Sequence, residues 1–334
     1  MTLTILYPEA LYPDEAVEVA LFGPDVRILV RDTAAMAELS DEDCARTDGL
    51  MMFRHWLGAA DLARFPRLRA IVRMGVGYDR IDRAAAAARG VLVCNVPDYG
   101  VTEVADHAMG MVLALRRGLL LHHDAQRRDP PAPWLAIDSP LLRRSGTQGF
   151  GIVGLGRIGT AVALRAKAFG FRVAFHDPHV PSGVEQSLGI DRAASLPDLL
   201  RRSDVLTLHT PLTPDTRGLI GAAELALLPE GAVVVNAARG PVLDLDALEA
   251  ALLSGRLAGA GLDVLPVEPP EPAPALLAAY RARAPWLEGR LIVTPHSAYL
   301  TPEANQDIRV KSAETMRAAL VEGRPRNVVT SDMA

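Results

Sequence analysis

Charged and titratable side chains follow three short apolar runs in the last third of the chain. Arg239 comes soon after the run Ala232–Asn236, Asp263 and Glu268 follow a second run, and His296 follows a third. Runs of this length and composition predict β-strands, and open α/β sheets bind their ligands at the carboxyl ends of their strands. The sequence therefore predicts a site in which a guanidinium, an imidazole and carboxylates converge.

These groups suit the transfer of a hydride between a nicotinamide and a small 2-oxo or 2-hydroxy acid. That reaction needs a cation to polarise the substrate carbonyl, an acid or base that works near neutral pH, and a group that binds the substrate carboxylate. Arg239 could supply the cation and His296 the proton. Because a hydrogen-bonded carboxylate favours a protonated imidazole, Glu268 would keep His296 ready for reduction, and we expect Glu268→Gln to lower the upper pH limit of that reaction.

Each of these three residues has an ordinary alternative when it is taken alone. Arg239 could be a surface cation, Glu268 a loop residue before a proline, and His296 a loop histidine whose ring is already hydrogen-bonded. Their order along the chain, each at a predicted strand end, favours the site.

Residues 149–159, with the sequence GFGIVGLGRIG, form a glycine-rich turn between a predicted strand and a predicted helix. Gly154 allows the tight turn, Gly156 lets the backbone approach a pyrophosphate, and Gly159 lets the helix pack close to the sheet. The amino end of that helix offers free N–H groups and a partial positive charge to phosphates. This pattern predicts a dinucleotide site.

Asp177 directly follows the next predicted strand, Arg172–His176. A carboxylate at this place accepts hydrogen bonds from the adenosine ribose and would repel a 2′-phosphate, so NAD is favoured over NADP. No arginine follows directly, since Pro178 and His179 come next. Two alternatives stay open: Asp177 could be a turn residue before the proline, and His179 could accommodate NADP.

Short β-branched or leucine-rich runs alternate with alanine-rich helical segments along most of the chain, which is typical of parallel sheets with βαβ connections. The first set of predicted strands comprises Leu3–Leu6, Val26–Val30, Leu50–Phe53, Ala70–Arg73 and Val91–Cys94. The second set comprises Gly149–Val153, Arg172–His176, Val205–His209, Ala232–Asn236, Ala258–Leu262 and Leu291–Thr294. A long helix over about 102–126 and a proline-rich arm at 128–134 separate the sets, and a helix over 302–323 follows the second.

Length and composition agree with a protein of two domains. The chain has 334 residues, 49% hydrophobic and 22% charged, with a formal charge of −5, which argues against a nucleic-acid partner. Cys44 and Cys94 cannot form a disulfide framework, and no targeting or membrane-spanning segment is evident, so we expect a cytoplasmic protein without a membrane partner. No metal is expected, because the remaining histidines lack metal-ligand spacing and are interpreted as structural or solvated: His55, His107, His122, His123 and His176.

Four segments carry a resemblance to a known family. They are Gly-Leu-Gly-Arg-Ile-Gly at 154–159, Asn-Ala-Ala-Arg-Gly at 236–240, Leu-Asp-Val with Glu-Pro at 262–269, and Thr-Pro-His at 294–296. In this order they resemble the D-isomer-specific 2-hydroxyacid dehydrogenase family, over nearly the whole chain. Segments 71–82, 94–106 and 163–171 are similar to its C-terminal-binding-protein-like subgroup.

The resemblance implies an α/β fold of two doubly wound parallel-sheet domains. A Rossmann-type NAD domain would span residues 102–299, and a smaller flavodoxin-like substrate domain would combine 1–101 with 300–334. Substrate would bind between them, with hinge closure excluding water. The implied function is an NAD-dependent oxidoreductase that transfers a hydride between the nicotinamide and a D-2-hydroxy acid or 2-oxo acid.

The resemblance also implies roles for single residues. Arg239 would act on the substrate carbonyl, His296 would be the acid or base with Glu268 as its partner, and Asp263 would lie against the nicotinamide carboxamide. The other implied cofactor contacts are Val104, Gly154, Leu155, Gly156, Arg157, Ile158, Gly159, Asp177, His209, Thr210, Pro211, Thr216, Asn236, Ala237 and Ala238.

The candidate substrate contacts are Arg54, Arg73, Gly75, Val76, Gly77 and Tyr299. By resemblance, the backbone of the glycine loop would hold the substrate carboxylate. The two arginines could face the same carboxylate, or they could form ion pairs elsewhere. The tyrosine could close one side of the pocket or pack at the domain hinge.

The family forms dimers, so the arm over 119–146 is expected to reach a second subunit and give a homodimer through the NAD domain. Between Glu268 and His296 lie 27 residues, more than the family usually has, and residues 274–286 are interpreted as an amphipathic insertion that covers the pocket or pads an interface. An alternative function is an NAD(H)-sensing, protein-binding module of the corepressor type, because corepressors of this subgroup keep the catalytic residues. A relative that acts on formate or phosphite also fits the fold.

Overall fold

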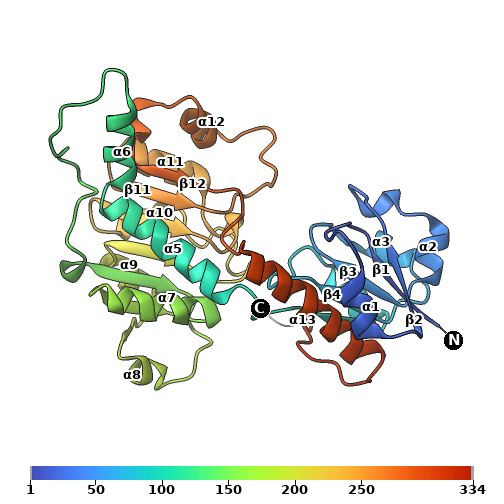
Figure 1. Ribbon diagram of the computed structural model, residues 1–334. Helices are drawn as coiled ribbons and strands as arrows, with labels where there is room; N and C mark the ends of the chain where they lie inside the picture. Colours follow the sequence, from blue (N-terminus) through green and yellow to red (C-terminus); the bar gives the residue numbers. More distant parts are fainter. Residues whose placement is uncertain (1, 332–334) are drawn as a thin grey trace. The chain divides into compact units, whose positions relative to one another are not determined.

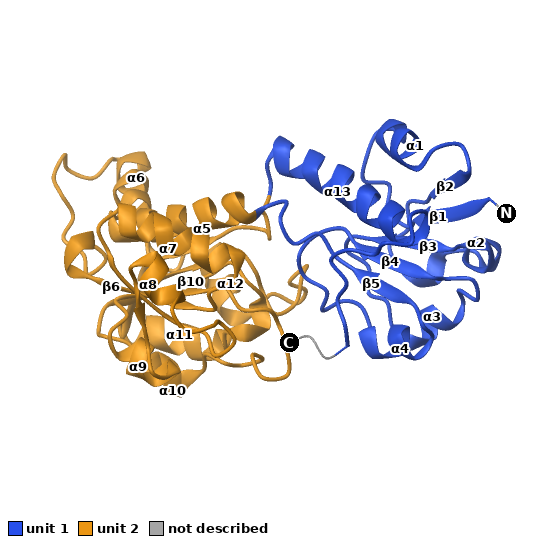
Figure 2. Cartoon of the chain, turned by 90° about the horizontal axis from the view of Figure 1, so that it is seen from below, with its two compact units in different colours: residues 1–100, 300–334 blue, residues 101–299 orange. Residues whose placement is uncertain are grey.

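The structure is a computed structural model that describes residues 2–331. It divides into two compact units, one made of residues 1–100 with 300–334 and the other of residues 101–299 (Figure 2). Each unit contains one parallel sheet with helices between its strands. The predicted fold class, α/β with two doubly wound parallel sheets, is confirmed.

The first unit is built on a five-stranded parallel sheet in the order β2-β1-β3-β4-β5, which is the flavodoxin-like order. Its strands are β1 (Leu3–Tyr7), β2 (Val26–Val30), β3 (Gly49–Met52), β4 (Ala70–Arg73) and β5 (Leu92–Cys94). Its helices are α1 (Ala16–Phe22), α2 (Asp41–Arg46), α3 (Ala59–Ala63), α4 (Arg83–Ala88) and α13 (Pro302–Leu320). The chain returns to this unit at residue 300 because α13 packs on α1 and on β3, β4 and β5 (Figure 1).

The second unit is built on a seven-stranded parallel sheet in the order β12-β11-β10-β9-β6-β7-β8. Its strands are β6 (Gly149–Val153), β7 (Arg172–His176), β8 (Asp191–Arg192), β9 (Val205–Leu208), β10 (Ala232–Asn236), β11 (Leu257–Leu262) and β12 (Leu291–Val293). The strand order reverses between β6 and β9, which creates the crevice where Rossmann-type sheets bind nucleotides.

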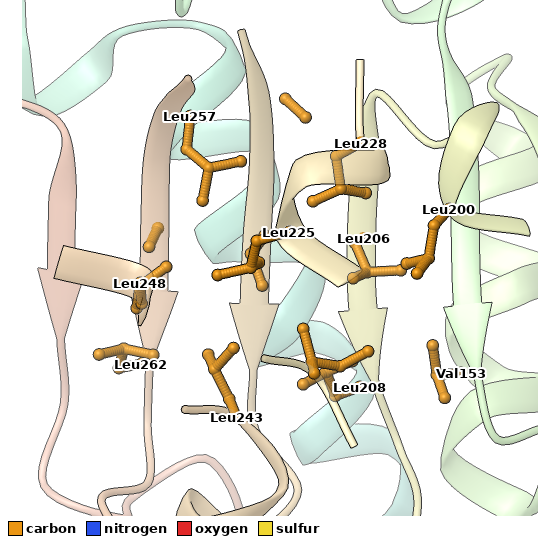
Figure 3. Close-up of a cluster of buried hydrophobic side chains, with 14 of the residues drawn as sticks. Val153, Leu200, Leu206, Leu208, Leu225, Leu228, Leu243, Leu248, Leu257 and Leu262 are labelled. Atoms are coloured by element: carbon orange, nitrogen blue, oxygen red, sulfur yellow. The ribbon is translucent and has the colours of Figure 1, made fainter. Parts of the chain in front are cut away.

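Helices cover both faces of the larger sheet. They are α5 (Val101–Arg116), α6 (Leu119–Arg127), α7 (Arg157–Ala168), α8 (Val184–Leu188), α9 (Leu196–Arg201), α10 (Ala222–Leu227), α11 (Leu245–Leu253) and α12 (Ala275–Arg281). On one face, buried leucines of α10 and α11 pack against β9 and β11 (Figure 3). On the other, α5 and α7 pack together over a second apolar cluster that includes Val112, Phe150 and Val162. Because parallel strands buried on both faces read as continuous apolar runs, the sequence revealed most of them.

The prediction of one helix over 102–126 is wrong. α5 ends at Arg116 and α6 begins at Leu119. Gly118 between them has φ 59°, a left-handed conformation that ends helices and that glycine adopts without strain. The short edge strand β8 was not predicted, because two residues leave no periodic pattern. No helix within residues 2–331 is long and apolar enough to cross a membrane.

Candidate active site

The candidate catalytic residues follow three neighbouring strands of the second unit. β10, β11 and β12 are adjacent and parallel, and their last residues lie side by side: Asn236 pairs with Leu262, and Leu262 with Val293. The loops after these strands therefore start at one level of the sheet edge. They carry Arg239, Glu268 and His296 respectively.

Glu268 and His296 meet although 27 residues separate them. His296 Nδ1 lies 2.7 Å from Glu268 Oε2. The other carboxylate oxygen accepts the Leu265 N–H at 3.0 Å, so both oxygens of Glu268 are engaged. Since Nδ1 faces the carboxylate, Nε2 lies on the opposite side of the ring. The segment between Glu268 and His296 contains α12 and the 3-10 turn Pro285–Leu287.

The His296 backbone is held in an uncommon conformation. Its φ is 52°, which costs free energy in a residue other than glycine. Its N–H donates to Asp263 O at 2.7 Å and to Thr294 O at 3.0 Å. The buried Asp263 carboxylate also accepts the Ser297 and Ala298 N–H groups, at 2.9 and 3.0 Å. Asp263 thus fixes the loop at His296 and at the two residues that follow it.

Arg239 belongs to a turn that the Asn236 side chain closes. The Ala238 N–H donates to Asn236 Oδ1 at 3.0 Å, and Asn236 Nδ2 donates to Arg239 O at 2.9 Å. A Cβ on Gly240 would lie only 2.0 Å from the Leu265 carbonyl carbon. The Arg239 turn therefore packs directly on the loop whose Leu265 N–H holds Glu268.

The glycine-rich turn has the shape that a pyrophosphate needs. Gly154 has φ 88°, and a Cβ on Gly159 would lie 2.1 Å from Gly154 O, so α7 packs tightly under the turn. A Cβ on Gly156 would meet nothing within 4 Å, which leaves open space beside the backbone. α7 begins at Arg157 without a side-chain cap, so its first N–H groups can bind an anion.

Asp177 ties the end of β7 to the same turn. Its Oδ2 accepts the Leu155 N–H at 2.8 Å and its Oδ1 accepts the His179 N–H at 2.9 Å. A carboxylate has about four acceptor sites, so each oxygen keeps a lone pair for a ribose hydroxyl. The Leu155 contact places Asp177 beside the glycine-rich turn, and the His179 contact is one that a turn residue before a proline also makes. Its role toward the ribose stays a prediction.

His209 and Thr210 follow β9 and line the other side of Gly154. A Cβ on Gly154 would come within 2.9 Å of both residues. Within the described residues, neither His209 ring nitrogen nor the Thr210 hydroxyl has a hydrogen-bond partner, although these atoms are buried. Burial lowers the pKa of His209 to about 4, so the ring is neutral at pH 7. Buried polar atoms without partners fit a loop that a bound cofactor completes.

The remaining predicted cofactor residues lie in the loop after β9 and in three further segments of the second unit. Thr216 donates to Pro211 O at 2.6 Å and so closes the loop after β9. The others occupy the first turn of α5, the first turn of α7 and the turn after β10: Val104, Arg157, Ile158, Ala237 and Ala238.

The predicted substrate residues of the first unit lie at the carboxyl ends of β3 and β4 and in the loops that follow them. The guanidinium carbons of Arg54 and Arg73 lie 5.3 and 5.7 Å from the centroid of the same Phe53 ring. Gly75 has φ 138°, a backbone conformation that glycine adopts without strain and that other residues rarely adopt.

Val76 and Gly77, two further predicted substrate residues, lie in the same loop as Gly75, whereas Tyr299 lies elsewhere. Val76 O accepts Asn95 Nδ2 at 2.7 Å, and Gly77 follows it half-buried. Tyr299 lies in the second unit beside His296. Its ring stands edge-on to the imidazole, with centroids 6.4 Å apart and an interplanar angle of 80°.

Sequence reasoning missed Glu9, which follows β1. Its carboxylate accepts the Phe53 and Arg54 N–H groups, both at 2.9 Å, and lies 3.2 Å from His55 Nδ1. Burial raises the pKa of Glu9, but the hydrogen bonds from His55 and from these backbone groups outweigh it, and the pKa lies below its usual value. Glu9 thereby holds the turn that carries Arg54. The strand-end rule that found Arg239 could also have found Glu9.

Sequence reasoning also missed the hydroxyl of Thr294, which donates to Asp263 Oδ1 at 2.6 Å. Among residues 2–331, no group of three or more His, Cys, Asp or Glu side chains could hold a metal ion.

Comparison with known proteins gives a consistent family relationship. The family model for the D-isomer specific 2-hydroxyacid dehydrogenase NAD binding domain matches residues 109–298. D-3-phosphoglycerate dehydrogenase of Methanocaldococcus jannaschii is 37% identical over 265 residues, which are 79% of this chain and 48% of that protein. D-3-phosphoglycerate dehydrogenase of Mycobacterium bovis is 39% identical over 266 residues, 78% of this chain and 46% of that one. The chain spans about half the length of these two relatives.

Solved structures of similar proteins match the chain from end to end. A glyoxylate reductase from Paecilomyes thermophila has a TM-score of 0.85 and 26% identity, with 99% of each chain covered. D-lactate dehydrogenase from Aquifex aeolicus, solved with NAD and lactic acid, has a TM-score of 0.82 and 26% identity, with 99% of this chain and 100% of that chain covered. The similarity to the C-terminal-binding-protein-like subgroup stays a prediction.

Proposed function

Because this chain belongs to the D-isomer-specific 2-hydroxyacid dehydrogenase family and carries its NAD-binding domain, we propose that it is an NAD-dependent oxidoreductase that interconverts a D-2-hydroxy acid and a 2-oxo acid. One observation supports this function above the others. His296 and Glu268 form a 2.7 Å hydrogen bond at a sheet edge, beside the turn that carries Arg239. This set is what proton transfer to a polarised carbonyl requires.

Each residue of the set has a separate task in the proposed reaction. A bound NADH supplies the hydride for reduction, and NAD accepts it for oxidation. His296 holds a proton at Nε2 and gives it to the carbonyl oxygen of the 2-oxo acid, while the positive charge of Arg239 stabilises the negative charge that develops there. Glu268 accepts the Nδ1–H, which orients the ring and stabilises the imidazolium.

We assign cofactor binding to the unit of residues 101–299 and substrate binding to the unit of 1–100 with 300–334. The loop Gly75–Gly77 presents backbone to the substrate carboxylate. Arg54 and Arg73 support this assignment, because their two positive charges share the Phe53 ring beside that loop. In the cofactor unit, Asp177 binds the adenosine ribose and repels a 2′-phosphate, so NAD is preferred.

A substrate screen tests the proposal. NADH oxidation is measured with glyoxylate, pyruvate, hydroxypyruvate and phenylpyruvate, using the wild type and His296→Asn. We expect turnover with at least one of these acids and a loss of about a hundredfold or more in the variant, since general acid catalysis contributes that much. Tight NADH binding without turnover of any 2-oxo acid would favour the NAD(H)-sensing module instead.

Three predictions on location and partners accompany this function. A small 2-oxo or 2-hydroxy acid is the expected ligand, with neither nucleic acid nor membrane as a partner. A homodimer is expected through the arm over 119–146, where Trp134 and Leu135 are 90% and 76% exposed. A cytoplasmic location is expected, and cell fractionation would test it.

A further inference from the structure

A histidine outside the proposed catalytic set contacts the loop that carries His296. His107 lies on α5, which packs on β10 and β11. Its Nε2 lies 3.0 Å from the hydroxyl oxygen of Thr294 and 3.7 Å from Asp263 Oδ1. The His107 side chain is 25% exposed and that of Asp263 only 1%. A helix on one face of the sheet thus touches the loops at the carboxyl end of β11 and β12.

The direction of each hydrogen bond in this contact can be assigned. The Thr294 hydroxyl has one hydrogen, and its 2.6 Å contact with the Asp263 carboxylate requires that Thr294 donate it. The hydroxyl oxygen must then accept the Nε2–H of His107 at 3.0 Å. A directed chain therefore runs from His107 through Thr294 to Asp263.

The side-chain hydrogen bond that the Asp263 carboxylate accepts comes from this series of residues. Its Oδ1 accepts Thr294 and the Ser297 N–H, and its Oδ2 accepts the Ala298 N–H. Within residues 2–331, no lysine or arginine nitrogen lies within 4.0 Å of this carboxylate, and His107 is its titratable neighbour at 3.7 Å. Because a buried carboxylate needs fixed donors to keep one geometry, His107 and Thr294 act together with the two backbone N–H groups to fix where the Asp263 oxygens lie.

We propose that His107 is a positioning residue for His296. By donating to Thr294 it holds the Asp263 carboxylate, which in turn holds the N–H groups of Ser297 and Ala298 and so fixes the loop that has the left-handed turn at His296. The catalytic consequence rests on the proposed function. The structural consequence does not, because the hydrogen-bonded series of His107, Thr294 and Asp263 lies wholly within the unit of residues 101–299.

Two pairs of substitutions distinguish the loss of a hydrogen-bond donor from a change in side-chain packing. His107→Gln keeps an amide N–H near the position of Nε2, whereas His107→Leu keeps the bulk without a donor. Thr294→Ser keeps the hydroxyl, whereas Thr294→Val keeps the shape without it. His123→Leu, at an exposed histidine on α6, is the control for the same chemical change away from the site.

Hydrogen exchange of the Ser297 and Ala298 amides, measured without cofactor or substrate, is the first readout. We expect exchange to become about tenfold faster or more in His107→Leu and in Thr294→Val. Exchange should stay within about twofold of wild type in His107→Gln, Thr294→Ser and His123→Leu. Equal acceleration in all four site variants would overturn the proposal, because packing and not donation would then be the cause.

The kinetic readout is kcat/KM for the 2-oxo acid that the wild type reduces. We expect a fall of about 10- to 100-fold in His107→Leu and Thr294→Val, the loss that a small displacement of a reacting group causes, with rescue by the conservative partners. The double variant His107→Leu with Thr294→Val should be no slower than either single variant. Unchanged exchange and unchanged kcat/KM in both disruptive variants would refute the inference while the proposed function stands. Accelerated exchange in a protein that reduces no 2-oxo acid would support the inference and refute the function.

Discussion

The Glu268 carboxylate is the single side chain on which the proposed acid–base chemistry depends most. One oxygen is fixed by the Leu265 N–H, and the other lies 2.7 Å from His296 Nδ1. If this carboxylate turned away from the ring, it would lose the hydrogen bond from the Leu265 N–H. Its charge therefore acts on the imidazole throughout the reaction.

Glu268→Gln should keep the hydrogen bond but remove the charge. We expect kcat/KM for reduction to fall by roughly a hundredfold, because the neutral amide no longer stabilises the positive charge on the ring that donates the proton. The measurement is kcat/KM at one fixed pH. Glu271→Gln, at an exposed position nearby, is the control, and equal kcat/KM for wild type and Glu268→Gln would remove Glu268 from this role.

His209 makes a second testable contribution, to stability. Burial lowers its pKa to about 4 in the folded chain, whereas an unfolded chain has an ordinary histidine with a pKa near ~6.5. The unfolded state therefore binds more protons between these values, so the folded state loses stability as the pH falls from about 6.5 to about 4.

Replacing His209 should reduce this acid sensitivity. Between pH 7 and pH 4.5 the wild type should lose about 2 kcal/mol more of its unfolding free energy than His209→Asn does. Urea unfolding at both pH values measures the difference. His123→Asn, at an exposed site, should behave like the wild type, and an equal loss in wild type and His209→Asn would show that the ring titrates normally.

The strand–turn–helix element β6–α7 combines two glycines with different demands. Gly159 has no room for a side chain, because its Cβ would lie 2.1 Å from Gly154 O, whereas Gly156 faces open space. Packing thus explains the first glycine, and only a ligand would explain the second. Gly156 also has an extended backbone that any residue can adopt, with φ −72°.

Alanine at these two positions should separate folding from cofactor binding. Gly159→Ala should lower the unfolding free energy by about 2 kcal/mol or more, because the backbone must shift. Gly156→Ala should unfold within about 2 °C of the wild type and yet bind NADH at least about tenfold more weakly. Thermal unfolding and fluorescence titration of NADH measure these effects. Wild-type NADH affinity in a folded Gly156→Ala protein would contradict the pyrophosphate assignment.

The sequence predicted most strands because a parallel sheet buried on both faces leaves continuous apolar runs, as in Ala232–Asn236, and because functional loops follow strand ends. It could not predict which side chains meet across loops. The Glu268–His296 hydrogen bond crosses an insertion of unknown path, and the His107–Thr294–Asp263 chain joins a helix to two strand ends. The break at Gly118 was missed because the apolar period continues on both sides of it.

At the scale of the whole molecule, exposed apolar residues on one segment indicate a surface that a second subunit covers. The segment after α6 exposes Trp134 and Leu135, and large exposed apolar side chains on one segment indicate an interface. We predict a homodimer at micromolar concentration, measured by size-exclusion chromatography with light scattering. Trp134→Ser with Leu135→Ser should shift the mass toward the monomer of 35.7 kDa. A wild-type monomer would refute the dimer.

The central claim is that this chain moves a hydride between a nicotinamide and C2 of a 2-oxo acid, with His296 as the proton donor. Reduction with NADH that carries deuterium at both hydrogen positions of C4, followed by chiral chromatography and mass analysis of the product, tests it most directly. The account predicts a D-2-hydroxy acid with one deuterium at C2, formed by the wild type and lost in His296→Asn. An L-configured product, a product without deuterium, or equal formation by His296→Asn would contradict it.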